Sequence, residues 1–499
     1  MPQRLEQIIG TSLEAHKDEP CYWWDGTWHG TAELLKLAED CGKTLAEAGF
    51  GKGQRLVVMM KNSPMIPALS LAVWRLGGTF CPLNVAAGIP ALRGTLDLIE
   101  PAGVVISPDV KEDVTAMLDE QGWPWVVSSP EGPLPAFRCK PGKPESEDLA
   151  VIFATSGTTG NPKAVPLTHE NLASNCIALK ESIPALQPGR VQLTVLPNFH
   201  SFGYTVATIL PLTMGGRLAI VPAFLPPQPA MRAILEAPVD ITFAVPAIYS
   251  YLLMAIERGK FPREGLSRQH LLIAGGDRLN PNIHEQALHL TGTDGMEGYG
   301  LTETSPVVSV TRTWETHRTG TVGPFLPGYE YKLRTREGKD TEEDEGVLWV
   351  KGPSVCHGYF RAPELTAERF EDGWFNTGDY VRIEDGYIRI LDRVTDILIV
   401  GGFNVYPQEV EKVLSQHPAV QTAIVVGIPH DINGEIPKAF IQRREGAEVT
   451  ERDLIKYAKE HLAHFKAPRS IEFVDEFPLS GTGKILRRVL RERTGRKSL

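Results

Sequence analysis

The residues with the clearest chemical capacity lie at positions 155–163, which read Thr-Ser-Gly-Thr-Thr-Gly-Asn-Pro-Lys. The glycines let the backbone turn tightly and bring its N–H groups close to an anion. The hydroxyl groups and the lysine add donors and a positive charge, so the segment suits a polyphosphate. Its Gly-x-x-Gly-x-x-Lys spacing is not that of a Walker A loop. A polar surface loop after a strand is the alternative. We name this segment the phosphate loop; its candidate ligands are Thr155, Ser156, Gly157, Thr158, Thr159, Gly160 and Lys163.

Two further segments carry groups that suit a nucleotide. In the run Tyr-Gly-Leu-Thr-Glu-Thr at 299–304, Tyr299 offers a flat face for a base and Thr302 a hydroxyl for a phosphate. Glu303 offers a hard oxygen ligand for Mg²⁺. In the run Gly-Trp-Phe-Asn-Thr-Gly-Asp, the carboxylate of Asp379 can accept both ribose hydroxyls. Turns with polar surface residues would also explain each segment.

Two cations complete the set of candidate residues. Arg393 follows a predicted hairpin and could reach a ribose or a phosphate, or form a surface salt bridge. Lys484 lies beside Gly481 and Gly483, and a lysine on such a loop could bridge a carboxylate and an α-phosphate. An exposed loop lysine is the alternative.

The elements that must position these residues follow from the apolar pattern. Strand and helix patterns alternate to about residue 290, which favours an α/β sheet with crossover helices. Residues 320–391 are β-rich, with a hairpin turn at 384–386. The last hundred residues resemble a small α+β unit, in which Thr450 and Asp453 form a capping box. We therefore predict an α/β protein with a large N-terminal domain of several subdomains, 1–392, and a small mobile C-terminal α+β domain, 393–499.

Bulk properties exclude some classes of protein. The chain has 499 residues, which is too long for one core, and its net charge of −10 argues against nucleic-acid binding. The six cysteines are scattered, so we expect a reducing, cytoplasmic compartment rather than disulfides. We expect no secretory signal and no transmembrane segment. The basic residues near the C-terminus, among them Arg487 and Arg491, are expected to lie on a solvated helix.

In order and spacing, these motifs resemble the adenylate-forming superfamily, which includes acyl- and aryl-CoA ligases, peptide-synthetase adenylation domains and luciferases. The resemblance spans roughly residues 150 to 488 and rests on an ordered set of motifs rather than on any one. The motifs lie at 155–163, 196–200, 299–304, 373–379, 392–393, 401–407 and 481–484.

The resemblance implies a two-step reaction with ATP, Mg²⁺ and coenzyme A as cofactors. A carboxylate attacks the α-phosphorus of ATP to give acyl-AMP and pyrophosphate, and a thiol then displaces AMP after the C-terminal domain turns. It implies that the phosphate loop holds the β- and γ-phosphates, and it assigns catalytic roles to Lys484, Thr302, Glu303 and His200. It places Tyr299 on adenine, Glu303 on Mg²⁺, Asp379 and Arg393 on ribose, Gly276 in the nucleotide and acyl site, and Gly402 at the thiol tunnel. Thr395 departs from the Asp or Lys that relatives carry at the hinge.

The same resemblance places an acyl pocket among mostly apolar or small residues, so an apolar, medium or long fatty acid is favoured. These residues are His200, Phe202, Gly203, Val206, Val245, Pro246, Gly275 and Gly276. For His200, a core histidine held by hydrogen bonds is an equal alternative. We expect an acyl-CoA synthetase with a small-molecule acid as its partner and with a homodimer possible. The first alternative acceptor is acyl carrier protein or another phosphopantetheine group. A non-catalytic AMP- or acyl-binding regulator is disfavoured because Lys484 and Glu303 are both present. A luciferase-type oxygenase would reveal itself by light or CO₂ release.

Overall fold

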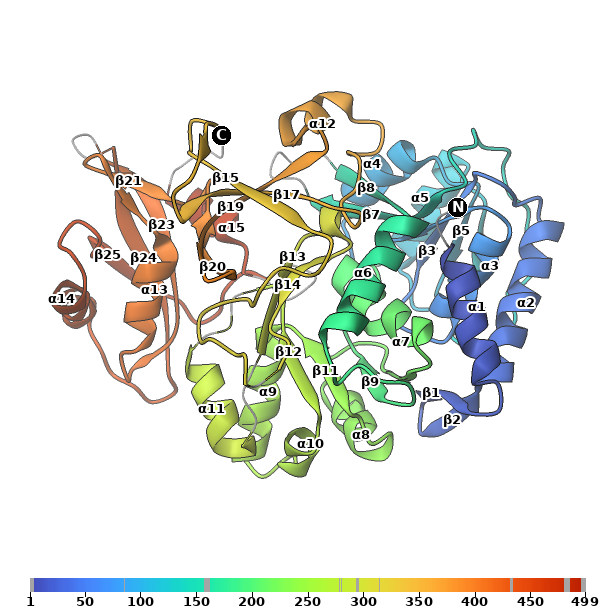
Figure 1. The fold of residues 1–499 in the computed structure, drawn as a ribbon, viewed down its shortest axis with the longest axis horizontal. Coiled ribbons are helices and arrows are strands. Elements are labelled where there is room, and N and C mark those ends of the chain that lie inside the picture. Colours follow the sequence, from blue (N-terminus) through green and yellow to red (C-terminus); the bar gives the residue numbers. More distant parts are fainter. Residues whose placement is uncertain are drawn as a thin grey trace.

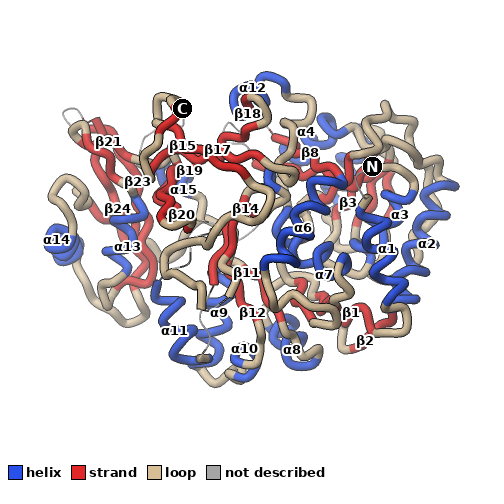
Figure 2. The backbone as a smooth tube through the Cα atoms, in the orientation of Figure 1, coloured by secondary structure: helices blue, strands red, loops and turns tan. Residues whose placement is uncertain are grey.

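The structure is a computed structural model, which describes residues 4–84, 86–156, 162–277, 279, 281–292, 296–313, 315–430, 434–479 and 485–494. Within these ranges the strands form four sheets. Figures 1 and 2 show three of them in a large N-terminal domain, and the fourth in a smaller C-terminal domain at the other end of the molecule. The predicted fold class, a large α/β domain followed by a small α+β domain, is confirmed.

The first sheet carries the phosphate loop between its last two strands. Its order is β6 (Trp125–Val127), β5 (Gly103–Ile106), β3 (Arg55–Met59), β4 (Thr79–Pro82), β7 (Leu149–Ser156) and β8 (Pro162–Thr168). All pairs are parallel except the last, in which β7 and β8 are antiparallel. The helices of this region are α1 (Leu5–Ala15), α2 (Thr31–Glu47), α3 (Met65–Arg75), α4 (Ile89–Ile99), α5 (Glu112–Gln121) and α6 (His169–Ser182).

The second sheet brings several pocket residues together at the ends of its strands. Its order is β14 (Val307–Val310), β13 (Met296–Gly300), β12 (Leu271–Ala274), β11 (Ile241–Ala244), β9 (Val191–Thr194), β10 (Arg217–Ile220), β1 (Pro20–Trp24) and β2 (Thr27–Gly30). Its helices are the π-helical η1 (Phe202–Ile209), α7 (Leu210–Thr213), α8 (Gln228–Glu236), α9 (Pro246–Glu257), α10 (Glu264–Ser267), α11 (Pro281–Thr291) and the 3₁₀ turn η2 (Thr302–Thr304). Strands β9, β11 and β12 are buried along their whole length, as expected for parallel strands covered on both faces.

The third sheet is antiparallel and ends the N-terminal domain. It contains β16 (Asp340–Thr341), β15 (Glu330–Arg334), β17 (Glu345–Lys351), β19 (Trp374–Glu384) and β18 (Phe370–Glu371), with β20 (Tyr387–Arg393) paired to β19 and α12 (Pro363–Arg369) preceding β18. Strand β19 alternates buried and half-buried residues, the pattern of a sheet with one core face. The predicted hairpin is present, and Asp385 and Gly386 form its turn with positive φ at both residues.

The C-terminal domain is built on the fourth sheet. It contains β22 (Phe403–Val405), β21 (Leu398–Val400), β24 (Gly434–Arg443) and β23 (Val420–His430), with β25 (Ser470–Phe473) paired to β24, and the helices α13 (Pro407–Ser415), α14 (Glu451–His461) and α15 (Arg487–Arg493). The predicted capping box is present at the start of α14, where Thr450 accepts a hydrogen bond from the backbone of Asp453. Because β20 ends at Arg393 and β21 begins at Leu398, the chain passes between the domains in this interval; the exact boundary at 392 stays a prediction.

The prediction of a solvated basic helix is wrong for two of its residues. Arg487 on α15 forms a two-armed ion pair with Glu411, and Arg491 pairs with Asp396. The side chains of Glu411 and Asp396 are only 12% and 14% exposed, so the arginines supply the charge that these carboxylates require when they are largely removed from water. Arg488 does lie on the exposed side, where it pairs with Glu492.

Two other predictions bear on the whole described chain. All six cysteines lie in the described ranges and all are free thiols, in agreement with the absence of a disulfide pattern. Within the same ranges, every helix is too short or too polar to cross a lipid bilayer.

Candidate active site

A cavity of about 350 Å³ lies where the phosphate-loop strands, η1, η2 and strands β12 to β14 meet. Polar side chains line one part of it, and we name these the polar wall: Thr155, Lys163, His200, Ser201, Tyr299, Thr302, Glu303, Tyr359, Arg369 and Arg393. Apolar side chains line another part, and we name these the apolar wall: Leu179, Phe202, Phe243, Ile273, Pro306, Val307 and Val310. Residues that lie far apart in the sequence therefore share one pocket.

Tyr299, Asp379 and Arg393 form a connected group at the polar wall. The hydroxyl of Tyr299 donates to Oδ2 of Asp379, and Nε of Arg393 lies 2.7 Å from Oδ1. Asp379 is only 2% exposed, so its charge is neutralised by this arginine rather than by water. The carboxylate raises the pKa of Arg393, while burial and then the same carboxylate raise the pKa of Tyr299. Tyr299 therefore stays a neutral donor and Arg393 stays charged.

The hairpin explains why these groups meet. Asp379 on β19 is paired directly with Arg393 on β20, so the two side chains start from neighbouring backbone positions. Arg393 also donates to the backbone carbonyl of Thr377 at 3.2 Å, and the N–H of Val394 donates to the carbonyl of Gly378 at 2.9 Å. The chain is thus held to β19 until just before it enters the C-terminal domain.

Glu303 lies on η2 with two neighbours from distant parts of the chain. Its Oε1 accepts a hydrogen bond of 2.7 Å from the hydroxyl of Tyr359. Nζ of Lys163 lies 5.9 Å from the centroid of the Tyr359 ring, within the range of a cation–π contact. Tyr359 therefore links strand β8, which carries Lys163, to the η2 turn, which carries Glu303.

Glu303 also fits the role of a Mg²⁺ ligand. Mg²⁺ bound with a nucleotide takes one or two carboxylates together with phosphate oxygens and water. Within the described ranges, no group of three or more His, Cys, Asp or Glu side chains is placed to hold a metal ion. A single carboxylate in a cavity with a lysine and a threonine suits an ion that arrives with its phosphates.

Thr302 contacts the side chain of Ser201, the residue that follows His200 in the chain. The hydroxyl of Ser201 donates to Oγ1 of Thr302 at 3.3 Å. The backbone N–H of Phe202 donates to Nδ1 of His200 at 3.2 Å. A neutral imidazole that accepts at Nδ1 carries its proton on Nε2, so His200 would present a donor from that atom.

Glycines allow the backbone to approach closely in this region. A Cβ on Gly300 would lie 1.8 Å from the carbonyl oxygen of Pro306, so only glycine fits beside the start of η2. Gly276 has a φ of 79° and lines the cavity, as the sequence predicted. Gly402 lies elsewhere, in the exposed turn between β21 and β22 of the C-terminal domain.

Some predicted residues cannot be placed. Lys484 and the phosphate-loop residues Gly157, Thr158, Thr159 and Gly160 lie outside the described residues, and of Ser156 only the backbone is described. Their roles stay predictions.

The cavity contains part of the set predicted for the acyl pocket, and the acyl-binding role of these residues stays a prediction. His200, Phe202, Gly275 and Gly276 line the cavity, but Gly203, Val206, Val245 and Pro246 do not. Gly203 and Val206 turn into the core because η1 buries almost all of its residues, and Val245 and Pro246 begin α9. The sequence did not reveal Tyr359, Arg369 or most of the apolar wall. A Gly-Tyr-Phe run at 358–360 was the available signal for Tyr359.

Comparisons with known proteins show the family of this chain. The AMP-binding enzyme family matches residues 10–360, and the AMP-binding enzyme C-terminal domain matches residues 409–484. The chain belongs to the AMP-binding enzyme family, and so to the adenylate-forming superfamily.

Individual relatives refine this placement. The chain is 36% identical to a long-chain-fatty-acid–CoA ligase of Escherichia coli, covering 98% of this chain and 94% of the relative. It is 31% identical to a feruloyl-CoA synthase of Amycolatopsis, covering 94% and 95%. A match to the long-chain-fatty-acid–CoA ligase of Yersinia pestis, at 37% identity, covers 69% of this chain but only 61% of the relative. Among solved structures, ATP-bound MatB from Rhodopseudomonas palustris aligns with a TM-score of 0.88 at 31% identity, covering 98% and 99%.

Proposed function

We propose that this protein is an AMP-forming acid–thiol ligase, which converts an apolar carboxylic acid, a fatty acid, to its acyl-AMP and then to its coenzyme A thioester. The observation that carries the proposal is the pairing of the two walls in one cavity. The polar wall offers groups for a nucleotide, and the apolar wall offers a surface without charge for an acyl group. The names of the relatives favour the same chemistry.

In the first step, an oxygen of the acid attacks the α-phosphorus and the bond to the β-phosphate breaks. A carboxylate is already a nucleophile, so the protein has to position the reactants and neutralise charge rather than remove a proton. Asp379 and Arg393 would hold the ribose, Tyr299 the base, and Thr302 the α-phosphate. Lys163, with the rest of the phosphate loop, would hold the leaving pyrophosphate. A Mg²⁺ ion held by Glu303 would supply positive charge against the phosphate oxygens.

In the second step, a thiol sulfur attacks the acyl carbon and the bond to AMP breaks. Gly402 would serve this step rather than the first, because it lies on the C-terminal domain and outside the cavity. A turn of that domain would bring it to the pocket, in keeping with one site that serves two reactions by closure. Coenzyme A is the proposed acceptor, and a phosphopantetheine carrier protein is the alternative. A cytoplasmic location and a homodimer stay predictions.

The decisive experiment is a panel of carboxylic acids of increasing chain length, including aromatic and dicarboxylic acids, assayed for pyrophosphate release with and without coenzyme A. We expect release with apolar monocarboxylic acids and a thioester product when coenzyme A is added. A thioester formed with holo-carrier protein but not with coenzyme A would identify the alternative acceptor. No pyrophosphate from any acid of the panel would contradict the proposal.

A further inference from the structure

Residues 356–361 run along the polar wall, and we name this segment the strap. Its first residue, Cys356, donates its backbone N–H to the backbone carbonyl of Glu303 at 2.8 Å. Three residues later the hydroxyl of Tyr359 donates to the side chain of Glu303 at 2.7 Å. The strap therefore fixes both the main chain and the carboxylate of the one acidic side chain in the cavity lining.

The other edge of the strap is joined to the strand that leaves the phosphate loop. The backbone N–H of Phe360 donates to the carbonyl of Ala164 on β8 at 2.9 Å, next to Lys163. The ring of Tyr359 is fixed edge-to-face against Phe370, with centroids 5.8 Å apart, and only 7% of the residue is exposed. Tyr359 thus stands between the candidate metal ligand and the phosphate-binding lysine with little freedom to move.

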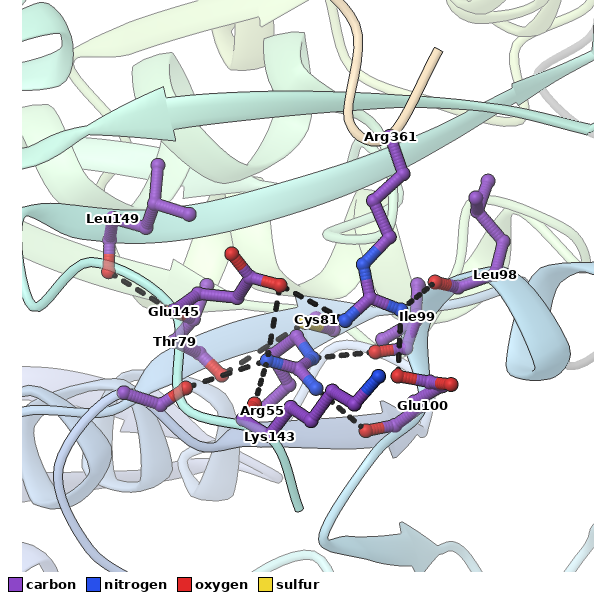
Figure 3. Close-up of polar contacts among 11 residues, drawn as sticks. Arg55, Thr79, Cys81, Leu98, Ile99, Glu100, Lys143, Glu145, Leu149 and Arg361 are labelled. Atoms are coloured by element: carbon purple, nitrogen blue, oxygen red, sulfur yellow. Dashed lines mark hydrogen bonds and ion pairs between the residues drawn. The ribbon is translucent and has the colours of Figure 1, made fainter.

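The strap is anchored to the first sheet by Arg361. Figure 3 shows its guanidinium reaching toward Glu100 and Glu145, with Arg55 beside both. Nη1 of Arg361 lies 2.6 Å from Glu100, and Nη2 lies 2.9 Å from Glu145. Arg361 has a φ of 53°, an unfavourable value for a residue with a side chain, so this contact holds the backbone where the strap needs it.

Arg55 makes the base of this anchor rigid. It is 1% exposed and donates to the backbone carbonyls of Lys143 at 2.9 Å and Glu100 at 3.0 Å. The residue that Arg361 contacts, Glu100, is thereby held through its own main chain. A continuous chain of contacts runs from the first sheet through Arg361 and Tyr359 to Glu303.

We propose that Tyr359 is a positioning residue for metal binding: its hydroxyl holds one oxygen of Glu303 so that the other is presented to Mg²⁺, and Arg361 keeps the strap in register. This inference rests on the proposed function, since it assumes a Mg²⁺–nucleotide substrate. Loss of a partner that orients a metal ligand commonly weakens metal affinity by about 10- to 100-fold.

The test is a Mg²⁺ titration of ATP binding by calorimetry with no acid present, so that no reaction occurs and the identity of the acid is irrelevant. For Tyr359→Phe, which keeps the ring, we expect the half-saturating Mg²⁺ concentration to rise about tenfold. AMP binding without metal should be unchanged. Glu303→Gln should show the larger shift, and adding Tyr359→Phe to it should cause no further shift, because the tyrosine acts only through that carboxylate.

A matched control is Tyr204→Phe. It also removes a buried hydroxyl, which donates to Ser70 at 2.7 Å in the core, and it should leave the Mg²⁺ titration unchanged. If Tyr359→Phe does not fold, Arg361→Lys takes its place, since lysine keeps the charge but loses the two-armed contact; it should raise the Mg²⁺ requirement in the same direction. An unchanged titration in the folded variant, or additive shifts in the double variant, would overturn the inference. Wild-type ATP binding that ignores Mg²⁺ would instead overturn the proposed function.

Discussion

The two walls of the cavity are held in place by different kinds of contact. At the polar wall, side chains from distant segments are bound to one another, as Tyr299, Asp379 and Arg393 are. At the apolar wall, contacts are packing contacts only, such as the edge-to-face pair of Phe202 and Phe243 with centroids 6.5 Å apart. Directional bonds fix atoms within tenths of an ångström, whereas packed apolar residues can be exchanged with volume as the main constraint. The difference suggests that the polar wall determines the reaction and the apolar wall determines which acid enters it.

The largest effect is expected for Lys484→Ala. This variant tests whether charged groups determine the reaction independently of the acid. If this lysine neutralises charge between the acid and the α-phosphate, acyl-AMP formation should be abolished for every acid alike. Thioester formation from supplied acyl-AMP should be retained, because in that step the bonds that form and break are at the acyl carbon and none is at phosphorus. Rates of the two half-reactions, measured separately, check this. Equal loss of both, or a loss that depends on the acid, would contradict the assigned role.

Asp379→Ala should weaken nucleotide binding next most strongly. The change removes the carboxylate that would accept two hydrogen bonds from the ribose hydroxyls, worth about 3 kcal/mol together. It also leaves the guanidinium of Arg393 without this carboxylate partner. We expect ATP affinity to fall by roughly 100-fold, independently of the acid present. Equilibrium binding of ATP measures this. Asp385→Ala, in the exposed hairpin turn of the same sheet, is the control that should bind ATP normally.

Phe202→Ala should change the choice of acid without changing ATP binding. The ring of Phe202 packs closely over Gly275, where an added Cβ would lie 2.9 Å from Cζ. Removing the ring enlarges the apolar wall, so the ratio of kcat/KM for a bulky acid to that for a short one should rise about tenfold. Phe224→Ala, outside the cavity lining, should leave the ratio unchanged. A parallel loss of ATP affinity in Phe202→Ala would break the division between the walls.

The acid stability of the fold that carries both walls depends on a buried histidine, His169. Burial, and then the charge of Arg4, lower the pKa of His169 to about 3. An unfolded chain protonates this group near pH 6.5, so between about pH 6.5 and 3 it binds one proton more than the folded chain. The free energy of unfolding should therefore decrease as the pH falls through this window, by up to about 1.4 kcal/mol per pH unit.

His169→Gln should show a flatter loss of melting temperature between pH 7 and pH 5 than the wild type does. His289→Gln, at an exposed position on α11, should keep the wild-type slope. If the melting temperature fell equally with pH in all three proteins, His169 would be excluded as the source of the acid sensitivity. Because His169 does not line the cavity, this acid sensitivity is separate from any pH effect on catalysis.

Much of the polar wall, and Asp379 beside it, could be predicted from the sequence because these residues occur in short contiguous motifs. Tyr299, Thr302 and Glu303 share six positions, and Asp379 and Arg393 flank a recognisable hairpin. Strands such as β3 and β4 were also predictable, since a short apolar run between turn residues leaves few alternatives. Local patterns were sufficient for these features.

The apolar wall could not be predicted in the same way. Leu179, Phe243, Ile273 and Val310 come from four different elements, and each resembles any other buried residue in the sequence. Which of them faces a cavity depends on how the sheets and η1 pack, which is tertiary information. Arg487 failed as a prediction for a related reason, because its partner Glu411 lies 76 positions away. Tyr359 was missed because the Gly-Tyr-Phe run at 358–360 is too short to distinguish a site residue from a buried aromatic residue.

The contact between Tyr299 and Asp379 has a consequence for how a nucleotide enters. Each oxygen of the Asp379 carboxylate already has at least one contact, from Tyr299 or from Arg393. A carboxylate has about four acceptor sites, so an incoming nucleoside can share these oxygens without displacing both partners. In the proposed role of Asp379, a ribose with two neighbouring hydroxyls would use more of the remaining acceptor capacity than a deoxy sugar, which would favour the ribonucleotide.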